Sequence, residues 1–577
     1  MFNNKNARTY QTGDLFLGLD ENSRPIGIST DRHAITIAGS RSGKGAGLII
    51  PNLKRWPDNI LCIDPKGENA ELTYQDREAM GQTVHVLDPF GSADIPDRIR
   101  AKFNPLPSID LTSNRARQDI ADIANGLIIS HDPRHMEWVE GARSLLAGII
   151  AYVIADAPPE HQNFASVRNM LMLPKETAGE SMGLWDHAQE MASDGRIGGL
   201  IRSAGVTLIT AMEAEKGMEK DFLGGARRAT EWLDDDAISE CLSDSTFQMS
   251  DLKTGNVSIY LVLPAGGTFL KTYGAFLRLF VKTAINAMTK RQQGKRCLFI
   301  LDEFYSLKKL DELSEAAGNF PSYGVHLWPF MQNLSQLTEL YGDDGSETFF
   351  ANSDAHIFFG NSDIKTLDYV SKMIGNLRPE DVAEPPPNRP FIDPKYATAR
   401  ELASIKHEED MKIHQHKMSV VGKPRIPPEQ LREMISKPDD GQVARYMVVF
   451  ARGGKTLKLA LQPYFLPQPE EHAPWEVFDK IYAESGMAPK FRKASFLLTK
   501  DIIKRYPNSR AAKMGLLEVV KYSGETTINI AKIPENPLQR WAGRTLSLEE
   551  YFEKRNEYLI EDANAPDRPV PTIKKSR

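Results

Sequence analysis

The residues that could do chemistry begin with a glycine-rich stretch near the N-terminus. Residues 38–45 read Ala-Gly-Ser-Arg-Ser-Gly-Lys-Gly and stand between two apolar runs. In the phosphate-loop pattern G-x-x-x-x-G-K-[ST], backbone N–H groups and the start of the next helix face a phosphate, and the lysine reaches its outer oxygens. This chain departs from that pattern at Ala38 and at Gly45.

The first departure is mild, because a small residue such as Ala38 still permits the tight turn. Gly45 matters more, since it lacks the hydroxyl that would bind Mg²⁺, and water or another side chain must then replace that ligand. A glycine-rich β-turn before a helix is the alternative to a nucleotide site. We expect ATP to be bound by a run of eight residues: Gly39, Ser40, Arg41, Ser42, Gly43, Lys44, Gly45 and Ala46.

An acidic pair supplies the second motif. The apolar run Leu298–Leu301 is followed at once by Asp302 and Glu303. This is the form of a Walker B strand, in which the first carboxylate holds Mg²⁺ and the second polarises water as a general base. A core strand that ends in an acidic turn is the alternative. We predict that both carboxylates face Lys44 from the adjacent strand.

Two further positions are candidates for the same site. Gln332 ends the apolar stretch 324–331, where RecA-like motors place a sensor of the γ-phosphate, although a surface glutamine is the alternative. The turn Asp64 to Glu68 follows the strand after the phosphate loop. Asp64 or Glu68 could complete the metal shell, and Lys66 could touch phosphate. The alternative is a loop that only packs against the phosphate loop.

These residues need a parallel sheet to bring them together. Short apolar runs at 34–39, 59–64, 83–87, 257–264, 296–301, 324–332 and 355–361 predict its strands. Alternation of strands with helices is the pattern of an α/β fold with crossover helices. Hairpins are predicted at 15–29, with its turn at Asp20–Pro25, and at 441–465, where the hairpin could close the sheet's edge.

The distance in sequence between Lys44 and Asp302 indicates an insertion, because a bare RecA-like core needs far fewer residues. Helical spacing of apolar residues fills 105–250. We therefore predict a nucleotide-binding domain in two parts, 1–104 and 251–470, around an all-α domain at 105–250. Residues 376–440 are proline-rich and charged, with EPPPNRP and KPRIPP as loop markers and an exposed segment, EEDMKIHQHKM, between them. Residues 471–577 are expected to form an extension with a disordered basic tail.

Several segments, in the same order over about residues 40–465, resemble the coupling proteins of type IV secretion systems, the TraG/TraD-like ATPases of conjugation. They include AGSRSGKGAGLIIPNL, CIDPKGENAELT, VLDPFG, LFILDEFYSL, YGVHLWPFMQNLSQLTELYG and FFANSDAHIFFGNSD. Some members also have GKG in the phosphate loop. The resemblance implies a RecA-like P-loop NTPase that works as a homo-hexamer with ATP and Mg²⁺ at subunit interfaces and an inserted all-α domain.

The resemblance also implies partners. The expected cargo is DNA, usually a single strand attached to a relaxase, which is passed to a type IV secretion channel; some relatives recruit protein effectors instead. Two alternatives stay open: a membrane-free DNA translocase without a secretion channel, and a cargo adaptor with weak ATPase activity. A neighbouring subunit is expected to supply an arginine finger, for which Arg378 and Arg425 are candidates.

Bulk properties bear on location. Three widely spaced cysteines argue against a disulfide framework and fit a reducing cytoplasm. The longest apolar stretch, Ser144–Ala157, is too short for a bilayer span of about 20 residues and predicts a buried helix. Relatives usually begin with membrane helices, whereas this chain begins almost at the nucleotide domain. We therefore expect a membrane-free subgroup, cytoplasmic or peripheral at the inner membrane; an anchor that has been removed is the alternative. Residues 481–577 carry 18 Lys and Arg against 12 Asp and Glu, which could favour DNA or an acidic partner.

Overall fold

The computed structural model divides the chain into two compact units, Met1–Pro463 and Tyr464–Arg577. Besides isolated positions, it describes residues 7–29, 31–129, 136–177, 182–214, 217–264, 269–310, 318–378, 399–438 and 443–466. In the second unit it describes a three-stranded antiparallel sheet of β12 (Val520–Tyr522), β13 (Thr527–Ile530) and β14 (Thr545–Ser547). The predicted disorder of the basic tail lies outside the described residues.

An eleven-stranded sheet forms the centre of the first unit, in the order β2-β1-β11-β10-β9-β3-β8-β7-β4-β6-β5. Every pairing from β9 to β5 is parallel, so the predicted α/β fold with a mostly parallel sheet is confirmed. The parallel strands are β3 (His33–Ala38), β4 (Asn59–Asp64), β5 (Thr83–Leu87), β6 (Val257–Val262), β7 (Cys297–Leu301), β8 (Val325–Met331) and β9 (Ser353–Phe359).

These strands read as continuous apolar runs because the sheet is covered on both faces. Successive side chains of β4 enter different cores: Ile60 and Cys62 join one hydrophobic cluster, and Leu61 and Ile63 join the other. The first cluster also contains Leu53 of α1 (Ile50–Leu53), and the second contains residues of α11 (Phe269–Thr289) and α13 (Leu334–Ala351). The carboxyl ends of the parallel strands therefore form one edge between two helical layers.

The antiparallel part of the sheet corrects one prediction. The hairpin β10 (Tyr446–Ala451) and β11 (Lys455–Ala460) lies inside the sheet, between β9 and β1. The edge is instead β2 (Pro25–Ile28), paired with β1 (Leu15–Leu19) in the predicted N-terminal hairpin. A hairpin can be predicted from its local turn. Its position in the sheet depends on pairing with strands that are distant in sequence, which the turn does not report.

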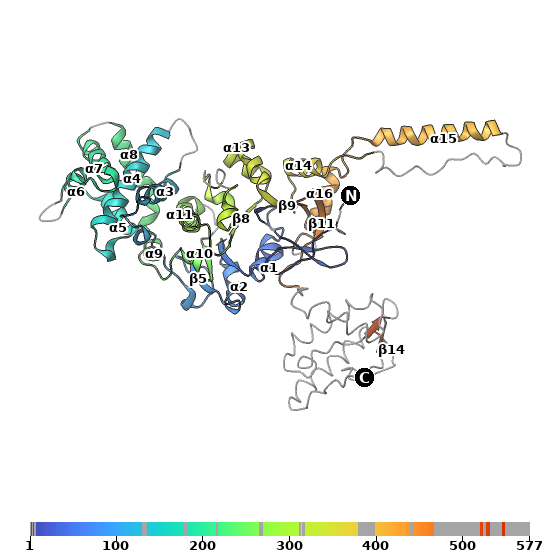
Figure 1. The fold of residues 1–577 in the computed structure, drawn as a ribbon, viewed down its shortest axis with the longest axis horizontal. Coiled ribbons are helices and arrows are strands. Elements are labelled where there is room, and N and C mark those ends of the chain that lie inside the picture. Colours follow the sequence, from blue (N-terminus) through green and yellow to red (C-terminus); the bar gives the residue numbers. More distant parts are fainter. Residues whose placement is uncertain are drawn as a thin grey trace, which may run out of the picture. The chain divides into compact units, whose positions relative to one another are not determined.

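A run of helices lies between β5 and β6 in the chain and forms the lobe at the left of Figure 1. The longest, α4, contains all but the last residue of the predicted apolar stretch, and ten of its residues are buried. By length and composition α4 is the one helix among the described residues that could span a membrane, and 56% of its most apolar window is buried. These helices are α3 (Ala116–Leu127), α4 (Met136–Asp156), α5 (Phe164–Met172), α6 (Leu184–Ser193), α7 (Arg196–Glu213), α8 (Met218–Ala229), α9 (Asp236–Cys241) and α10 (Asp251–Thr254).

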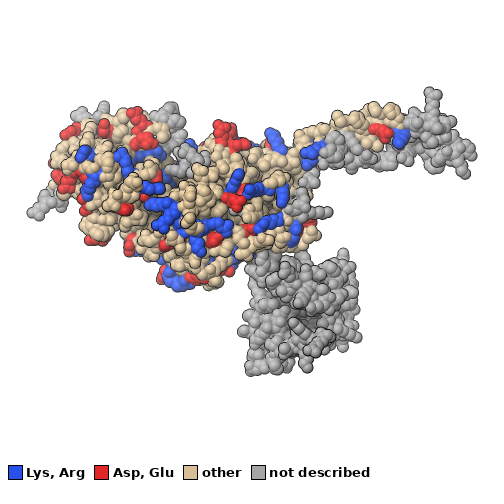
Figure 2. Space-filling view, viewed as in Figure 1, with Lys and Arg blue, Asp and Glu red and all other residues tan. Residues whose placement is uncertain are grey.

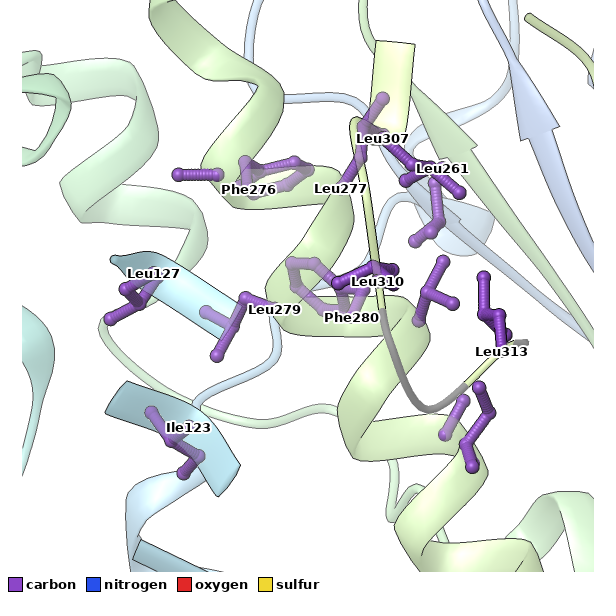
Figure 3. Packing of buried hydrophobic residues seen from close by; sticks show 14 of the residues in the cluster. Ile123, Leu127, Leu261, Phe276, Leu277, Leu279, Phe280, Leu307, Leu310 and Leu313 are labelled. Atoms are coloured by element: carbon purple, nitrogen blue, oxygen red, sulfur yellow. The ribbon is translucent and has the colours of Figure 1, made fainter. Parts of the chain in front are cut away.

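Helix α11 joins this lobe to the sheet. Figure 3 shows Phe276, Leu279 and Phe280 of α11 beside Ile123 and Leu127 of α3, with Leu261 of β6 on the sheet side. On the same helix, Arg278 is 7% exposed and donates from Nε to the Gly126 carbonyl oxygen at 2.8 Å. Apolar packing and a buried hydrogen bond therefore anchor α3, the first helix of the lobe, to α11, which packs against the sheet.

The remaining helices flank the phosphate loop or follow β9. They include α2 (Glu68–Ala79), α14 (Ile364–Ile374), α15 (Ala399–Val420) and α16 (Pro428–Ile435). The segment EEDMKIHQHKM between the two proline-rich loop markers lies within α15, and α16 begins at the last proline of KPRIPP; the marker EPPPNRP lies outside the described residues. Prolines bracket these helices in sequence and end the local helical pattern, but the charged stretch between them is itself compatible with an exposed helix.

Candidate nucleotide-binding site

The glycine-rich stretch forms a tight loop between β3 and the following helix. Arg41 and Gly43 both have left-handed backbones, with φ of 54° and 100°. The Ser42 hydroxyl donates to the Gly39 carbonyl oxygen at 2.6 Å, which closes the turn. The chain then enters a π-helical turn, η2 (Gly45–Ile49), before α1. Phosphate-binding loops require such a turn, because it directs successive N–H groups and the helix N-terminus to one point.

Two segments that are distant in sequence pack against this loop and fix its conformation. A Cβ atom on residue 39 would overlap the Gly360 carbonyl oxygen, just after β9, so only glycine fits there. On the other side, a Cβ on residue 43 would stand 2.5 Å from Val443 Cγ1, and the Ala444 N–H donates to the Ser42 carbonyl oxygen at 2.8 Å. The loop conformation is therefore held by the fold before any ligand binds.

Lys44 and Asp302 come together at the carboxyl edge of the sheet. Burial raises the pKa of Asp302 to about 6, and the positive charge of Lys44 is the largest influence that opposes this rise. Within the described part of the chain, the Lys44 ammonium has no carboxylate within ion-pair distance, so it is held near the acid without being neutralised by it. A cation and a carboxylate in this arrangement can hold opposite sides of a Mg²⁺–triphosphate.

The strand order corrects the sequence prediction in one respect. The acidic strand β7 is not adjacent to β3, because β8 lies between them. The register places Ile37 of β3 beside Met331 of β8, and Leu301 of β7 beside Pro329. Gln332, the residue after β8, therefore comes between the phosphate loop and the acidic pair. All three predicted motifs meet at the carboxyl edge, where α/β proteins bind ligands.

Asp64 stands level with Asp302 on the neighbouring strand, since Ile63 pairs with Leu301. Its Oδ2 accepts a hydrogen bond from the Ala70 N–H at 2.8 Å, which holds the first turn of α2. Burial raises the pKa of Asp64 to about 7, opposed by backbone hydrogen bonds and reinforced by the charge of Asp302. Asp64 therefore has a structural task at the site, and one of its oxygens is already engaged.

The other two candidate residues of this turn, Lys66 and Glu68, are exposed. The positive charge of Lys66 contributes to lowering the pKa of Asp302, which places it near the acidic pair. Glu68 is the first residue of α2, and none of the interactions that shift the pKa of Asp302 or Asp64 comes from it. The fold therefore brings Lys66 to the site, and the metal-binding role of Glu68 stays a prediction.

Glu303 occupies an unusual backbone position. Its φ and ψ of 56° and 44° lie in the left-handed region, and its N–H donates to Asp302 Oδ1 at 3.1 Å. Directly after it, η8 (Phe304–Leu307) buries Phe304 and Leu307. For a non-glycine residue this backbone costs about 1–2 kcal/mol, and such strain gathers at functional sites. The buried turn holds Glu303 in this conformation next to the metal-binding candidate.

The main chain around Gln332 is fixed by side chains from three elements. The Gln332 N–H donates to Gln336 Oε1 at 2.8 Å, and its carbonyl oxygen accepts from Asn361 Nδ2 at 3.3 Å. The next turn is held by the Leu334 N–H, which donates to Thr366 Oγ1 at 3.0 Å. Among the described residues, no group bonds to the Gln332 side-chain amide, which is free to meet a ligand.

Asn361, which follows β9, is not among the residues predicted for the site. The residue is 1% exposed, and its Oδ1 has no hydrogen-bond partner among the described residues. The sequence could have indicated Asn361 as a candidate, because it is a polar residue shortly after a buried parallel strand, as Gln332 is. The two arginine-finger candidates lie elsewhere: the Arg425 N–H donates to the Gly375 carbonyl oxygen after α14, and Arg378 is exposed nearby.

The residues present fit ATP with Mg²⁺. Mg²⁺ is held by one or two carboxylates together with substrate phosphates and water, and Asp302 supplies a carboxylate. A Cβ on residue 45 would meet nothing within 4 Å, so the position where a hydroxyl normally stands is open. A water molecule can therefore take the place of the missing side-chain ligand.

The fold is similar to that of solved bacterial conjugative coupling proteins. The plasmid coupling protein TrwB in complex with ADP and Mg²⁺ aligns with a TM-score of 0.52 at 15% identity, covering 81% of this chain and 92% of that one. A TrwBΔN70 structure in complex with sulphate aligns with a TM-score of 0.52, also at 15% identity, and covers 79% and 90%. At this identity the likeness establishes the fold.

Sequence relatives agree with the structural likeness. Protein VirD4 of Agrobacterium fabrum is 26% identical over 442 residues, covering 75% of this chain and 58% of VirD4. Conjugal transfer protein TraG of Escherichia coli is 27% identical over 372 residues, covering 59% and 55%. The chain thus spans a little over half the length of these relatives. The family model described as type IV secretory system conjugative DNA transfer matches residues 2–486, so the chain belongs to that family.

Proposed function

We propose that this protein is an ATP-driven coupling protein that recruits DNA–relaxase cargo and passes it to a type IV secretion channel during conjugative transfer. The observation that carries the proposal is the placement of Lys44 against buried Asp302 at the carboxyl edge of the sheet, in a chain of this family. VirD4 and TraG relatives, and TrwB with ADP and Mg²⁺, support the same function.

The phosphate loop is the proposed phosphate-binding element. The N–H groups of Gly39 and Ser42 already donate to the carbonyl oxygens of Phe359 and Gly39. The other backbone N–H groups of the loop and the N-terminus of the following helix donate to phosphate oxygens, and Lys44 neutralises their charge. Asp302 holds Mg²⁺, with water in place of the hydroxyl absent at Gly45. When bound, the metal ion neutralises the charge that develops on the phosphates during transfer. Lys66 adds a second positive charge beside the acidic pair.

Hydrolysis is assigned to the residues that flank this metal-binding position. Glu303 is the proposed general base, which orients the attacking water and accepts its proton. Gln332 is the proposed sensor, since its main chain is fixed while its side-chain amide has no partner among the described residues. An arginine from a neighbouring subunit would complete the site in a homo-hexamer, with Arg378 and Arg425 as candidates.

The proposed cargo is DNA, as a single strand attached to a relaxase, with protein effectors as a second class. Figure 2 shows Lys and Arg side chains over the middle of the visible face, beside a lobe on which acidic side chains are prominent. Contacts of such cations with DNA phosphates depend steeply on salt and weakly on sequence. We place the protein on the cytoplasmic side of the bacterial inner membrane, in contact with channel components.

The test is DNA-stimulated ATP hydrolysis by the wild-type chain and by Lys44→Ala and Glu303→Gln. Both variants are expected to lose hydrolysis, and Lys44→Ala also loses nucleotide binding. Lys54→Ala is the matched control, because Lys54 forms an ion pair with Asp76 at 2.8 Å at the end of α1. Background hydrolysis in the wild type with retained relaxase binding would favour the cargo adaptor, for which Gly45 is the supporting feature. DNA-stimulated hydrolysis without affinity for channel components would favour a translocase unconnected with secretion.

A further inference from the structure

The side chain of Asn361 crosses the end of the phosphate-loop strand. β3 lies between β9 and β8 in the sheet. Asn361 follows β9, yet its Nδ2 donates to the carbonyl oxygen of Gln332, which follows β8. The amide therefore links the two strands that flank β3, at the level where the phosphate loop begins. The Gly360 backbone packs against Gly39 at the same place.

The orientation of this amide follows from its one partner. A carbonyl oxygen only accepts, so the atom of Asn361 that faces Gln332 must be the NH₂ group. The remaining atom, Oδ1, can only accept, and it is buried with no partner among the described residues. A buried polar atom left without its hydrogen bond costs about 1–3 kcal/mol. In the ligand-free fold, Asn361 therefore works against stability at this atom.

The location of Asn361 indicates how this cost in folding free energy can be offset. The Asn361 backbone lies beside Gly39 at the start of the phosphate loop, and the Asn361 amide bonds to the main chain of the proposed sensor Gln332. The missing partner of Asn361 Oδ1 must be a donor, which excludes direct contact with a phosphate oxygen. A water ordered by the bound nucleotide, or an N–H group that moves when the phosphate loop is loaded, has the required chemistry.

We infer that Asn361 is a positioning residue of the nucleotide site, which fixes Gln332 across the end of β3 and satisfies its Oδ1 only when a triphosphate is bound. This inference rests on the proposed ATP binding and deepens it. Asn361 then helps the protein distinguish a triphosphate from a diphosphate, because the γ-phosphate is the group that Gln332 is proposed to sense.

The test compares Asn361→Leu with Asn59→Leu in the full chain. Asn59 is equally buried, but its amide is fully bonded: Nδ2 donates to the Leu252 and Gly255 carbonyl oxygens, and Oδ1 accepts from the Val257 N–H. Thermal unfolding is measured without ligand, with Mg²⁺–ADP, and with Mg²⁺ and the non-hydrolysable ATP analogue AMP-PNP. Lys44→Ala is the control for a protein that no longer binds nucleotide, and its Tm should not rise with either nucleotide.

Without ligand, Asn361→Leu is expected to unfold within about 2 °C of the wild type, and Asn59→Leu well below it. The rise in Tm with Mg²⁺–AMP-PNP should fall by at least half in Asn361→Leu, and the rise with Mg²⁺–ADP should be unchanged. A ligand-free Tm that falls as far as that of Asn59→Leu overturns the inference, and so does an undiminished rise with AMP-PNP. If wild type and Lys44→Ala both show no rise with either nucleotide, the proposed function fails and this inference with it.

Discussion

The Gly360 carbonyl oxygen occupies the space into which a Cβ atom on Gly39 would project. These two residues are far apart in sequence, yet their backbones touch because β3 and β9 are neighbours in register, with Ala38 beside Phe359. Contact between two backbones cannot be relieved by a change of side-chain rotamer. The glycine at the start of the phosphate loop is therefore required by packing as well as by the turn.

Gly39→Ala should destabilise the protein by about 1–3 kcal/mol, the usual cost of overpacking, and should weaken nucleotide binding because the loop must shift. Gly45→Ala is the control, since a Cβ at residue 45 meets nothing within 4 Å. Urea unfolding and binding of a fluorescent ATP analogue measure the two effects. Equal stability and equal affinity of both variants would contradict the packing argument.

Gly45→Ser should restore the hydroxyl ligand that this phosphate loop lacks. The site has room for it, and residue 45 begins a right-handed helical turn that serine can adopt. We expect Mg²⁺-dependent nucleotide affinity to rise about fivefold, as for one added polar contact of about 1 kcal/mol. Gly45→Ala adds the Cβ without the hydroxyl, so any gain shared by both variants would refute a metal-ligand role.

Glu303→Gly should stabilise the protein while it removes hydrolysis. Glycine adopts the left-handed backbone of residue 303 without strain, which is expected to raise the free energy of unfolding by about 1 kcal/mol. Glu303→Ala loses the same carboxylate but keeps the strained backbone. Chemical denaturation compares the two variants, and the expectation fails if they unfold at the same denaturant concentration.

Asp64 should make the metal-free protein less stable as the pH rises. Its pKa is about 7 in the folded chain, against about 4 in an unfolded one. Between these values the folded chain binds more protons than the unfolded chain, so the free energy of unfolding decreases with rising pH. The contribution of the neutral carboxyl is complete below about pH 4 and lost above about pH 7.

Asp64→Asn removes this titration and can still accept a hydrogen bond from the Ala70 N–H. In EDTA it should be more stable than the wild type at pH 8 by about 1–3 kcal/mol, and similar to it at pH 4. Urea unfolding at both pH values provides the measurement. Asp97→Asn, on the exposed surface, serves as the control. A wild-type pH profile that is retained in Asp64→Asn would show that another group titrates.

Much of the site could be predicted from the sequence because each motif is local. An apolar run followed by glycines, or by two acids, marks a strand end whatever the neighbouring strand is. Parallel strands bring their carboxyl ends to one edge, so Lys44, Asp302 and Gln332 could be expected together without knowledge of the strand order. The same local signals predicted the N-terminal hairpin and the helical lobe.

Which strands are neighbours was decided only by the tertiary structure. The insertion of β8 between β3 and β7, the internal place of the hairpin β10–β11, and the bond from Asn361 to Gln332 all join residues distant in sequence. The hydrogen bond from the Ala70 N–H to Asp64, which gives this residue a structural role beside its predicted one, likewise emerges only in the folded chain. Periodicity reports which side of an element is buried, but hydrogen bonds and contacts between distant segments form only when the whole chain has folded.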